Sequence, residues 1–328
     1  MKAKLSRRVL MAAAVASLAV PTVSRSQGTF FPERAIKIVL PAAPGGILDQ
    51  TGRILAKELQ DAMGAPVVIE NRAGAGGRIG TDAVMRSAPD GYTLLLVTNG
   101  TLTYIPAVER NGAFEPLKEL TPLSEIGSYN LIMVVHPSVP AKTVQEFISY
   151  ARSNPGKINY ASSGQASGLH FAGEVFKAMT RVDMTHVAYK GSAPALQDVI
   201  ANVCQVMFAT GEVLTQVQAG KVRALATTTT RRDPRMLTVP TLSEAGVNGY
   251  NLGASISLLG PKGLPREVQD KLVASVRKVV GSPDVRVKLE ALGIHVVAGT
   301  PTQLEAQLRA ETATLTDVAI RLNISAEK

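Results

Sequence analysis

Short apolar runs alternate with helix-like runs along most of this chain. Between residues 36 and 97, the runs IKIVL and PVVIE each lead into a glycine-rich turn and then into a helical pattern. Further apolar runs cover 131–136, 158–163, 186–190, 203–209 and 222–228. Strands that alternate with helices usually pair in parallel, with the helices packed on the faces of the sheet. The pattern therefore predicts an α/β fold built on parallel sheets.

The chain is long enough to form two hydrophobic cores. It has 328 residues, of which 45% are hydrophobic, and single cores stop growing at about 250–300 residues. The stretches 121–131 and 249–261 are the best candidates for crossings between two lobes. We expect one domain to comprise residues 28–126 and 252–328, and the other to comprise residues 127–251.

The first 26 residues have the layout of a cleavable export signal. Basic residues precede an apolar run from Val9 to Val20, which is too short to span a bilayer. Cleavage after Ser26 suits the small residues at the end of this segment. The stretch SRRVL at 6–10 fits a twin-arginine signal in part, and the general secretory route is the alternative. Either route predicts a periplasmic protein.

The charge distribution excludes a nucleic-acid reader. The formal net charge is +9, but five basic residues and no acid lie in the export signal, so the remainder carries about +4. The remaining basic residues are scattered, and aromatic residues make up only 4% of the chain. A nucleic-acid reader would show a basic stripe interleaved with aromatic residues. A mild positive bias suits an anionic ligand instead.

The sequence contains no recognisable catalytic or metal-binding constellation. The four histidines are widely spaced, and they form neither an HExxH pair nor a cysteine–histidine ligand set. GQASG at 164–168 is not a Gly-x-Ser-x-Gly elbow. Cys204, the lone cysteine, lies in the apolar run VCQVMFA, which predicts a buried packing residue. We expect no metal and no cofactor, and His170 is the histidine best placed to face a cleft.

The loop AAPGGILD at 42–49 has the features of an anion site. Gly45 and Gly46 allow the backbone to turn sharply, and the helix that follows directs its first N–H groups to the same place. Asp49 lies in the first turn of that helix. It either complements the helix dipole or pairs with a cationic group of a ligand, and the sequence leaves both interpretations open.

A second glycine loop, GAGGRIG at 74–80, resembles a dinucleotide fingerprint only superficially. The third small residue of that fingerprint would fall where Ile79 stands. We therefore expect this loop to shape the fold rather than to touch a ligand.

Polar residues follow several other predicted strands. Open α/β sheets bind ligands at the carboxyl ends of their strands, so these residues are candidate ligand contacts. Structural alternatives remain: Ser167 is also a good helix cap, and Glu212 is also a typical acid at a helix start. The candidates at these strand exits are Thr98, Asn99, Ser163, Gly164, Ser167, Thr210 and Glu212.

Eight segments, in order along the chain, resemble the solute receptors of tripartite tricarboxylate transporters, known as the Bug family. They are PAAPGGILD (41–49), VVIENRAGAGGRIG (67–80), APDGYTLLL (88–96), NPGKINYASSG (154–164), HVAYKG (186–191), GKVRALA (220–226), VPTLSEAG (239–246) and GTPTQLEAQLRAE (299–311). Any one of these segments would be a weak signal, but their ordered combination is specific.

The resemblance implies a two-lobed periplasmic binding protein of type II, the Venus-flytrap class. Such a receptor closes on a small carboxylate (a di- or tricarboxylate, an acidic amino acid or an aromatic acid) and delivers it to membrane permease subunits. A monomer is the expected state. The residues implicated are Gly45, Gly46, Asp49, Thr98 and Asn99, with Ser163, Gly164 and Ser167 across the cleft. Ala43, His170, Thr210 and Glu212 complete the set of candidate ligand contacts.

The chain departs from the family pattern at several positions that bear on the ligand. The aromatic residue that often precedes the Pro-Gly-Gly turn is replaced by Ala42 or Ala43, and the stretch GASISL at 253–258 lacks the usual tryptophan. We expect a roomier or more polar pocket. If Glu212 faces the cleft, it should favour a ligand with a cationic or hydroxyl group over a second carboxylate.

Two other function classes stay open at this point. An exported α/β hydrolase or transferase would need a nucleophile with a positioned base, or a metal. A receptor could also pass ligand occupancy to a signalling partner instead of a transporter.

Overall fold

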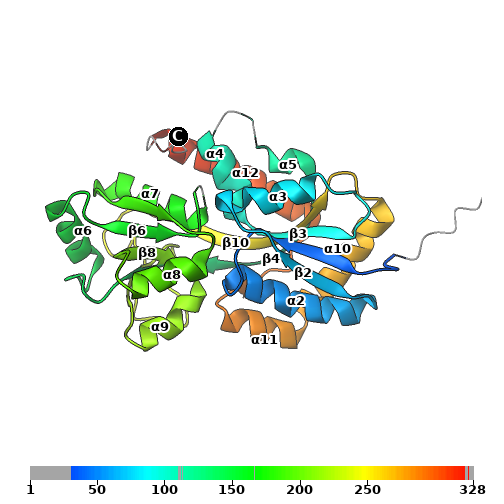
Figure 1. The fold of residues 1–328 in the computed structure, drawn as a ribbon, viewed down its shortest axis with the longest axis horizontal. Helices are drawn as coiled ribbons and strands as arrows, with labels where there is room; N and C mark the ends of the chain where they lie inside the picture. Colours follow the sequence, from blue (N-terminus) through cyan, green and yellow to red (C-terminus); the bar gives the residue numbers. More distant parts are fainter. Residues whose placement is uncertain (1–30, 110–111, 113, 166, 322–323, 325–328) are drawn as a thin grey trace, which may run out of the picture. The chain divides into compact units, whose positions relative to one another are not determined.

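The computed structural model describes residues 31–109, 112, 114–165, 167–321 and 324 (Figure 1). The export signal expected at residues 1–26 lies outside the described residues. Within the described part of the chain, no helix is both long enough and apolar enough to span a membrane.

Two sheets form the framework of a two-lobed α/β fold. The sheet of the first lobe has six strands in the order β11-β4-β10-β3-β1-β2, and that of the second has five in the order β7-β6-β8-β5-β9. The strands of the first sheet are β1 (Ile36–Leu40), β2 (Val67–Asn71), β3 (Thr93–Thr98), β4 (Leu120–Asn130), β10 (Gly253–Pro261) and β11 (His295–Val296). Those of the second are β5 (Ile132–Val135), β6 (Asn159–Ser162), β7 (Thr185–Ala188), β8 (Val206–Ala209) and β9 (Arg223–Thr227).

Helices cover both faces of the six-stranded sheet. Figure 1 shows α3, α5 and α12 on one side of it and α2 and α11 on the other. The helices of this lobe are α2 (Ile47–Met63), α3 (Arg78–Met85), α4 (Ile105–Glu109), α5 (Pro116–Glu119), α10 (Arg266–Gly281), α11 (Pro283–Ala291) and α12 (Pro301–Arg321), with the short turns η2 (Ala75–Gly77) and η3 (Gly100–Tyr104). The second lobe carries α6 (Val144–Ser153), α7 (Gly168–Thr180), α8 (Ser192–Ile200), η4 (Gly211–Val213) and α9 (Leu214–Gln218).

The core of the first lobe lies between its sheet and α12. Central strands that are covered on both faces are apolar throughout, and Leu95 and Val97 of β3 are fully buried. Leu304 and Leu308, which recur at helical spacing in α12, pack in the same cluster. The periodic leucines thus fix which face of α12 meets the sheet.

The expectation of parallel sheets is correct for only part of each sheet. β1 pairs in parallel with β2 and β3, and β6 pairs in parallel with β7 and β8. However, β10 is antiparallel to both β3 and β4, and β5 is antiparallel to β8 and β9. The stretches 121–131 and 249–261 largely form β4 and β10. One of these strands leaves the first lobe and the other returns to it, so they run in opposite directions.

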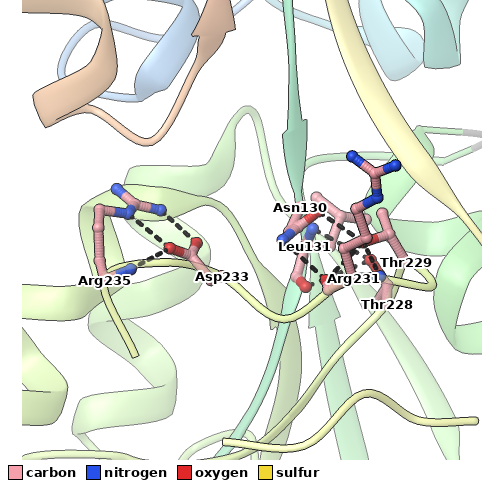
Figure 2. Close-up of polar contacts among 7 residues, drawn as sticks. All are labelled: Asn130, Leu131, Thr228, Thr229, Arg231, Asp233 and Arg235. Carbon is pink, nitrogen blue, oxygen red and sulfur yellow. Dashed lines mark hydrogen bonds and ion pairs between the residues drawn. The ribbon is translucent and has the colours of Figure 1, made fainter. Parts of the chain in front are cut away.

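The end of the first crossing is hydrogen-bonded to the segment that follows β9 (Figure 2). Thr228 N donates to Leu131 O at 3.0 Å, and Leu131 N donates to Thr228 Oγ1 at 3.1 Å. Beside them, Thr229 Oγ1 donates to Asn130 Oδ1 at 2.7 Å. Leu252 N, just before β10, donates to Thr228 O at 2.8 Å, and Asn130 pairs with Gly253, so both crossings meet here at the natural position for a hinge.

Candidate functional site

A cavity lies where the two lobes face each other. Its volume is about 70 Å³. The first lobe contributes the residues after β1 and β3 and the η2 turn to the wall. The second lobe contributes the residues after β6 and β8 and the starts of α7 and α8. The wall is therefore built largely from strand exits and helix starts.

Backbone segments of the two lobes meet directly around this cavity. Ala43 N donates to Lys190 O across the interface at 3.2 Å. A Cβ atom added to Gly46 would lie 2.6 Å from Ser192 Oγ, and one added to Gly100 would lie 2.7 Å from Gly168 N. The glycines thus allow a close approach that no larger residue would permit, and the structure shows the lobes closed on each other.

Three helix N-termini converge on the cavity wall. α2 and α8 begin after Gly46 and Gly191, neither of which has a side chain to cap the first N–H groups. α7 begins after Ser167, whose hydroxyl accepts a hydrogen bond from His170 N at 3.3 Å. Uncapped helix starts direct free N–H groups and a partial positive charge toward the space in front of them. Such a wall suits an anion.

The side chains on the wall add to this positive character. Among the described residues that line the cavity, Lys190 is the charged one, and none is a carboxylate. The described residues also contain no group of three or more His, Cys, Asp or Glu side chains that could hold a metal ion.

Asp49 supports the loop and does not line the cavity. Its carboxylate accepts hydrogen bonds from Gly45 N at 3.0 Å, Arg53 Nε at 2.9 Å and Asn71 Nδ2 at 3.1 Å. Burial opposes its ionisation, but the bonds from Arg53, Gly45 and Asn71 outweigh burial and lower the pKa of Asp49. Gly45 has φ +91°, so the carboxylate fixes a turn that favours glycine. These contacts favour the structural interpretation of Asp49 over the pairing with a ligand cation.

His170 also lies behind the wall, which corrects the expectation that it faces the cleft. Its ring stacks on that of His186 with 3.8 Å between centroids, and Tyr160 stacks beside both. Burial lowers the pKa of His170 to about 4. Because α7 presents this side to β6 and β7, the imidazole packs inside the second lobe.

The remaining candidates divide between the wall and the layer behind it. On the wall lie Ala43, Gly46, Thr98, Asn99, Ser163, Ser167 and Thr210. Gly45, Gly164 and Glu212, like Asp49 and His170, do not line the cavity. Gly164 of the second lobe packs directly against the first lobe, where an added Cβ would lie 3.2 Å from Gly76 N.

Asn99 connects the wall to the hinge and to the C-terminal helix. Its Oδ1 accepts a hydrogen bond from Ser255 N of β10 at 3.0 Å, and its Nδ2 donates to Glu311 Oε1 of α12. The pKa of Glu311 is raised to about 7, mainly by burial; the Asn99 bond opposes this rise, and the nearby Glu125 adds to it. The position of Asn99 on the wall therefore depends on a half-buried acid.

Comparison with known proteins identifies the family. The family described as "Tripartite tricarboxylate transporter family receptor" matches residues 51–322. The chain belongs to this family. The solved structure of the periplasmic binding protein BugD is 30% identical and covers 90% of this chain and 100% of its own, with a TM-score of 0.86.

Two further similar structures were solved with carboxylates. A protein from R. palustris with adipate is 33% identical and covers 90% of this chain and 99% of its own, with a TM-score of 0.86. MatC from Rhodopseudomonas palustris, with bound malate, is 32% identical and covers 88% of this chain and 99% of its own, with a TM-score of 0.84.

Several wall residues of this Bug-family protein were not anticipated. Gly74, Gly76 and Gly77 line the cavity, although we expected their loop only to shape the fold. Lys190, Gly191 and Ser192 at the start of α8 also line the cavity. They follow a predicted strand and could approach a ligand, but a solvated lysine is the commoner case, so they were not among the candidate contacts. Tyr129 lines the cavity from β4, a segment that carried no recognisable strand signal.

Proposed function

We propose that this protein is a periplasmic receptor that captures a small carboxylate between its lobes and delivers it to the permease subunits of a tripartite transporter. The observation that carries the proposal is the convergence of three helix starts and Lys190 on a cavity whose described wall holds no carboxylate. The adipate and malate bound by two relatives support the same ligand class. A monomer suits a receptor that must dock on a membrane partner.

The proposal includes a domain division and a route of export. Residues 28–126 and 252–328 form the first domain, and residues 127–251 form the second. β4 continues to Asn130 and β10 begins at Gly253, so both crossings fall close to these boundaries. Residues 1–26 direct export to the periplasm, by the twin-arginine or the general secretory route.

A thermal-shift screen of the protein from Gln27 onward tests the ligand class. The panel comprises dicarboxylates, citrate, acidic amino acids, aromatic acids and nicotinate. A ligand that binds only the folded state should stabilise it by roughly 2.7 kcal/mol at a hundredfold excess over Kd. Succinamide, the uncharged diamide of succinate, is the matched control and should give no shift. A flat response to the whole panel at millimolar concentration would contradict the proposal.

A further inference from the structure

Thr210 brings a hydroxyl group to the cavity at the exit of β8. It lies on the wall and is almost fully buried. Its Oγ1 donates a hydrogen bond to Oε1 of Glu212, two residues further along the chain. A hydroxyl carries one hydrogen and two lone pairs. The Thr210 oxygen therefore offers only acceptor capacity to any additional partner.

Glu212 keeps one carboxylate oxygen without a partner. Its Oε2 is buried and accepts no hydrogen bond from the described residues. A buried acceptor without a partner is costly, so this oxygen calls for an explanation. Tyr129 on the cavity wall is close enough to feel the charge, since burial and the negative Glu212 together raise the pKa of its phenol. Glu212 therefore gives this part of the cavity a negative potential.

The opposite character prevails at the helix starts. The free N–H groups of α2 and α8, together with Lys190, supply donors and positive charge. The cavity thus has a region of donors and, around Thr210, a region of acceptors. A carboxylate matches the first region, and a hydrogen-bond donor matches the second.

We propose that Thr210 and Glu212 make this receptor select a carboxylate that also carries an ammonium or hydroxyl group over an unsubstituted dicarboxylate. Thr210 accepts the donor group directly, and Glu212 acts as a positioning residue that holds the Thr210 hydrogen away from the ligand. The inference rests on the proposed function, because it concerns the second group of a ligand whose carboxylate is held at the helix starts.

Calorimetric titration with aspartate, malate and succinate tests the selection. These acids share a four-carbon skeleton and differ in one substituent, which is ammonium, hydroxyl or hydrogen. A buried acceptor that gains or loses its donor changes affinity by about tenfold or more, so aspartate and malate should bind at least tenfold more tightly than succinate.

Two substitutions remove the selection by different routes. Glu212→Gln supplies an amide N–H that can donate to Thr210, so the Thr210 hydroxyl becomes free to turn toward the ligand as a donor. Thr210→Val keeps the shape of the side chain and removes the acceptor. Both should bring the three affinities to within about threefold of one another while the succinate affinity stays nearly constant. Glu267→Gln, an exposed change in α10, is the matched control and should keep the wild-type ratios.

The ratio of the affinities for the three acids separates selection from a general loss of structure. If the two residues had only a structural role, the substitutions would weaken the binding of all three acids equally. Equal binding of the three acids by the wild type would overturn the inference and leave the carboxylate function intact. A wild-type preference that survives in both variants would also overturn it. Binding of none of the three, together with a flat thermal-shift panel, would contradict the proposed function itself.

Discussion

Gly100→Ala should nearly abolish carboxylate binding while the protein without ligand stays folded. Gly100 begins η3 in the first lobe, and an added Cβ would lie 2.7 Å from N and 3.0 Å from Cα of Gly168 in the second lobe. Both atoms belong to the backbone at the start of α7, so no side-chain rotation can relieve the overlap. The backbone of Gly100 does not have positive φ and accepts alanine. Within the first lobe the added Cβ would also lie 3.3 Å from Cδ2 of Tyr104, a milder contact with a side chain. Most of the energetic cost of the substitution therefore falls on lobe closure.

Calorimetric titration and thermal unfolding measure the two effects separately. Overpacking by one methyl group against rigid neighbours costs up to about 3 kcal/mol, so we expect affinity to fall by roughly 100-fold. The unfolding temperature without ligand should change by less than about 2 °C. Gly281→Ala is the control, since a Cβ there meets no atom within 4 Å. Unchanged affinity in Gly100→Ala would show that ligand binding does not need the lobe contact seen here.

The stability that Glu311 contributes should be lost as pH rises from about 5 to 8, and Glu311→Gln should remove that loss. The pKa of Glu311 is raised to about 7 in the folded chain, mainly by burial, whereas an unfolded glutamate has a pKa of about 4.3. Between these two values Glu311 binds more protons in the folded state than in the unfolded state. Its contribution to the free energy of unfolding therefore decreases with rising pH across this window, by up to about 3 kcal/mol. The buried His170, whose pKa is lowered to about 4, acts in the opposite direction below about pH 6.5, so the contribution of Glu311 is the difference between wild type and variant.

Urea unfolding of the wild type and of Glu311→Gln at pH 5 and pH 8 measures the contribution of Glu311 to the free energy of unfolding. Glutamine at position 311 can still accept the hydrogen bond from Asn99 Nδ2, and it has no proton to lose. The variant should consequently be more stable than the wild type at pH 8. Glu305→Gln, an exposed change in the same helix, is the control and should keep the wild-type pH dependence. An identical pH dependence in Glu311→Gln would assign the effect to another group.

The sequence patterns predicted most local structure because period and turn chemistry are local. The run IKIVL forms β1, and the helical pattern that follows its glycine-rich turn forms α2. β4 and β10 were not recognised as strands, because we interpreted 121–131 and 249–261 only as crossings. Their strand character comes from pairing with each other over most of their length.

The difference between local sequence patterns and long-range contacts also explains which parts of the candidate site were predicted. The loops after β1, β3, β6 and β8 were found because polar or glycine-rich strand exits have a known use. The direction of individual side chains was not found, because it depends on distant partners. Asp49 turns away from the cavity to meet Asn71 of β2, and His170 turns away to stack on His186 of β7. Neither contact follows from spacing along the chain.

A distance between the lobes, measured with and without ligand, tests most directly whether carboxylate capture is lobe closure. Spin labels on Gln60→Cys in α2 and Gln218→Cys in α9 occupy exposed positions on the two lobes, and the buried Cys204 does not compete for the label. Because binding and closure are linked, a carboxylate that raises the unfolding temperature should shift the population toward a shorter distance. In Gly100→Ala, addition of the carboxylate should leave the distribution of distances as it is without ligand. The same distribution with and without a bound carboxylate would contradict the account.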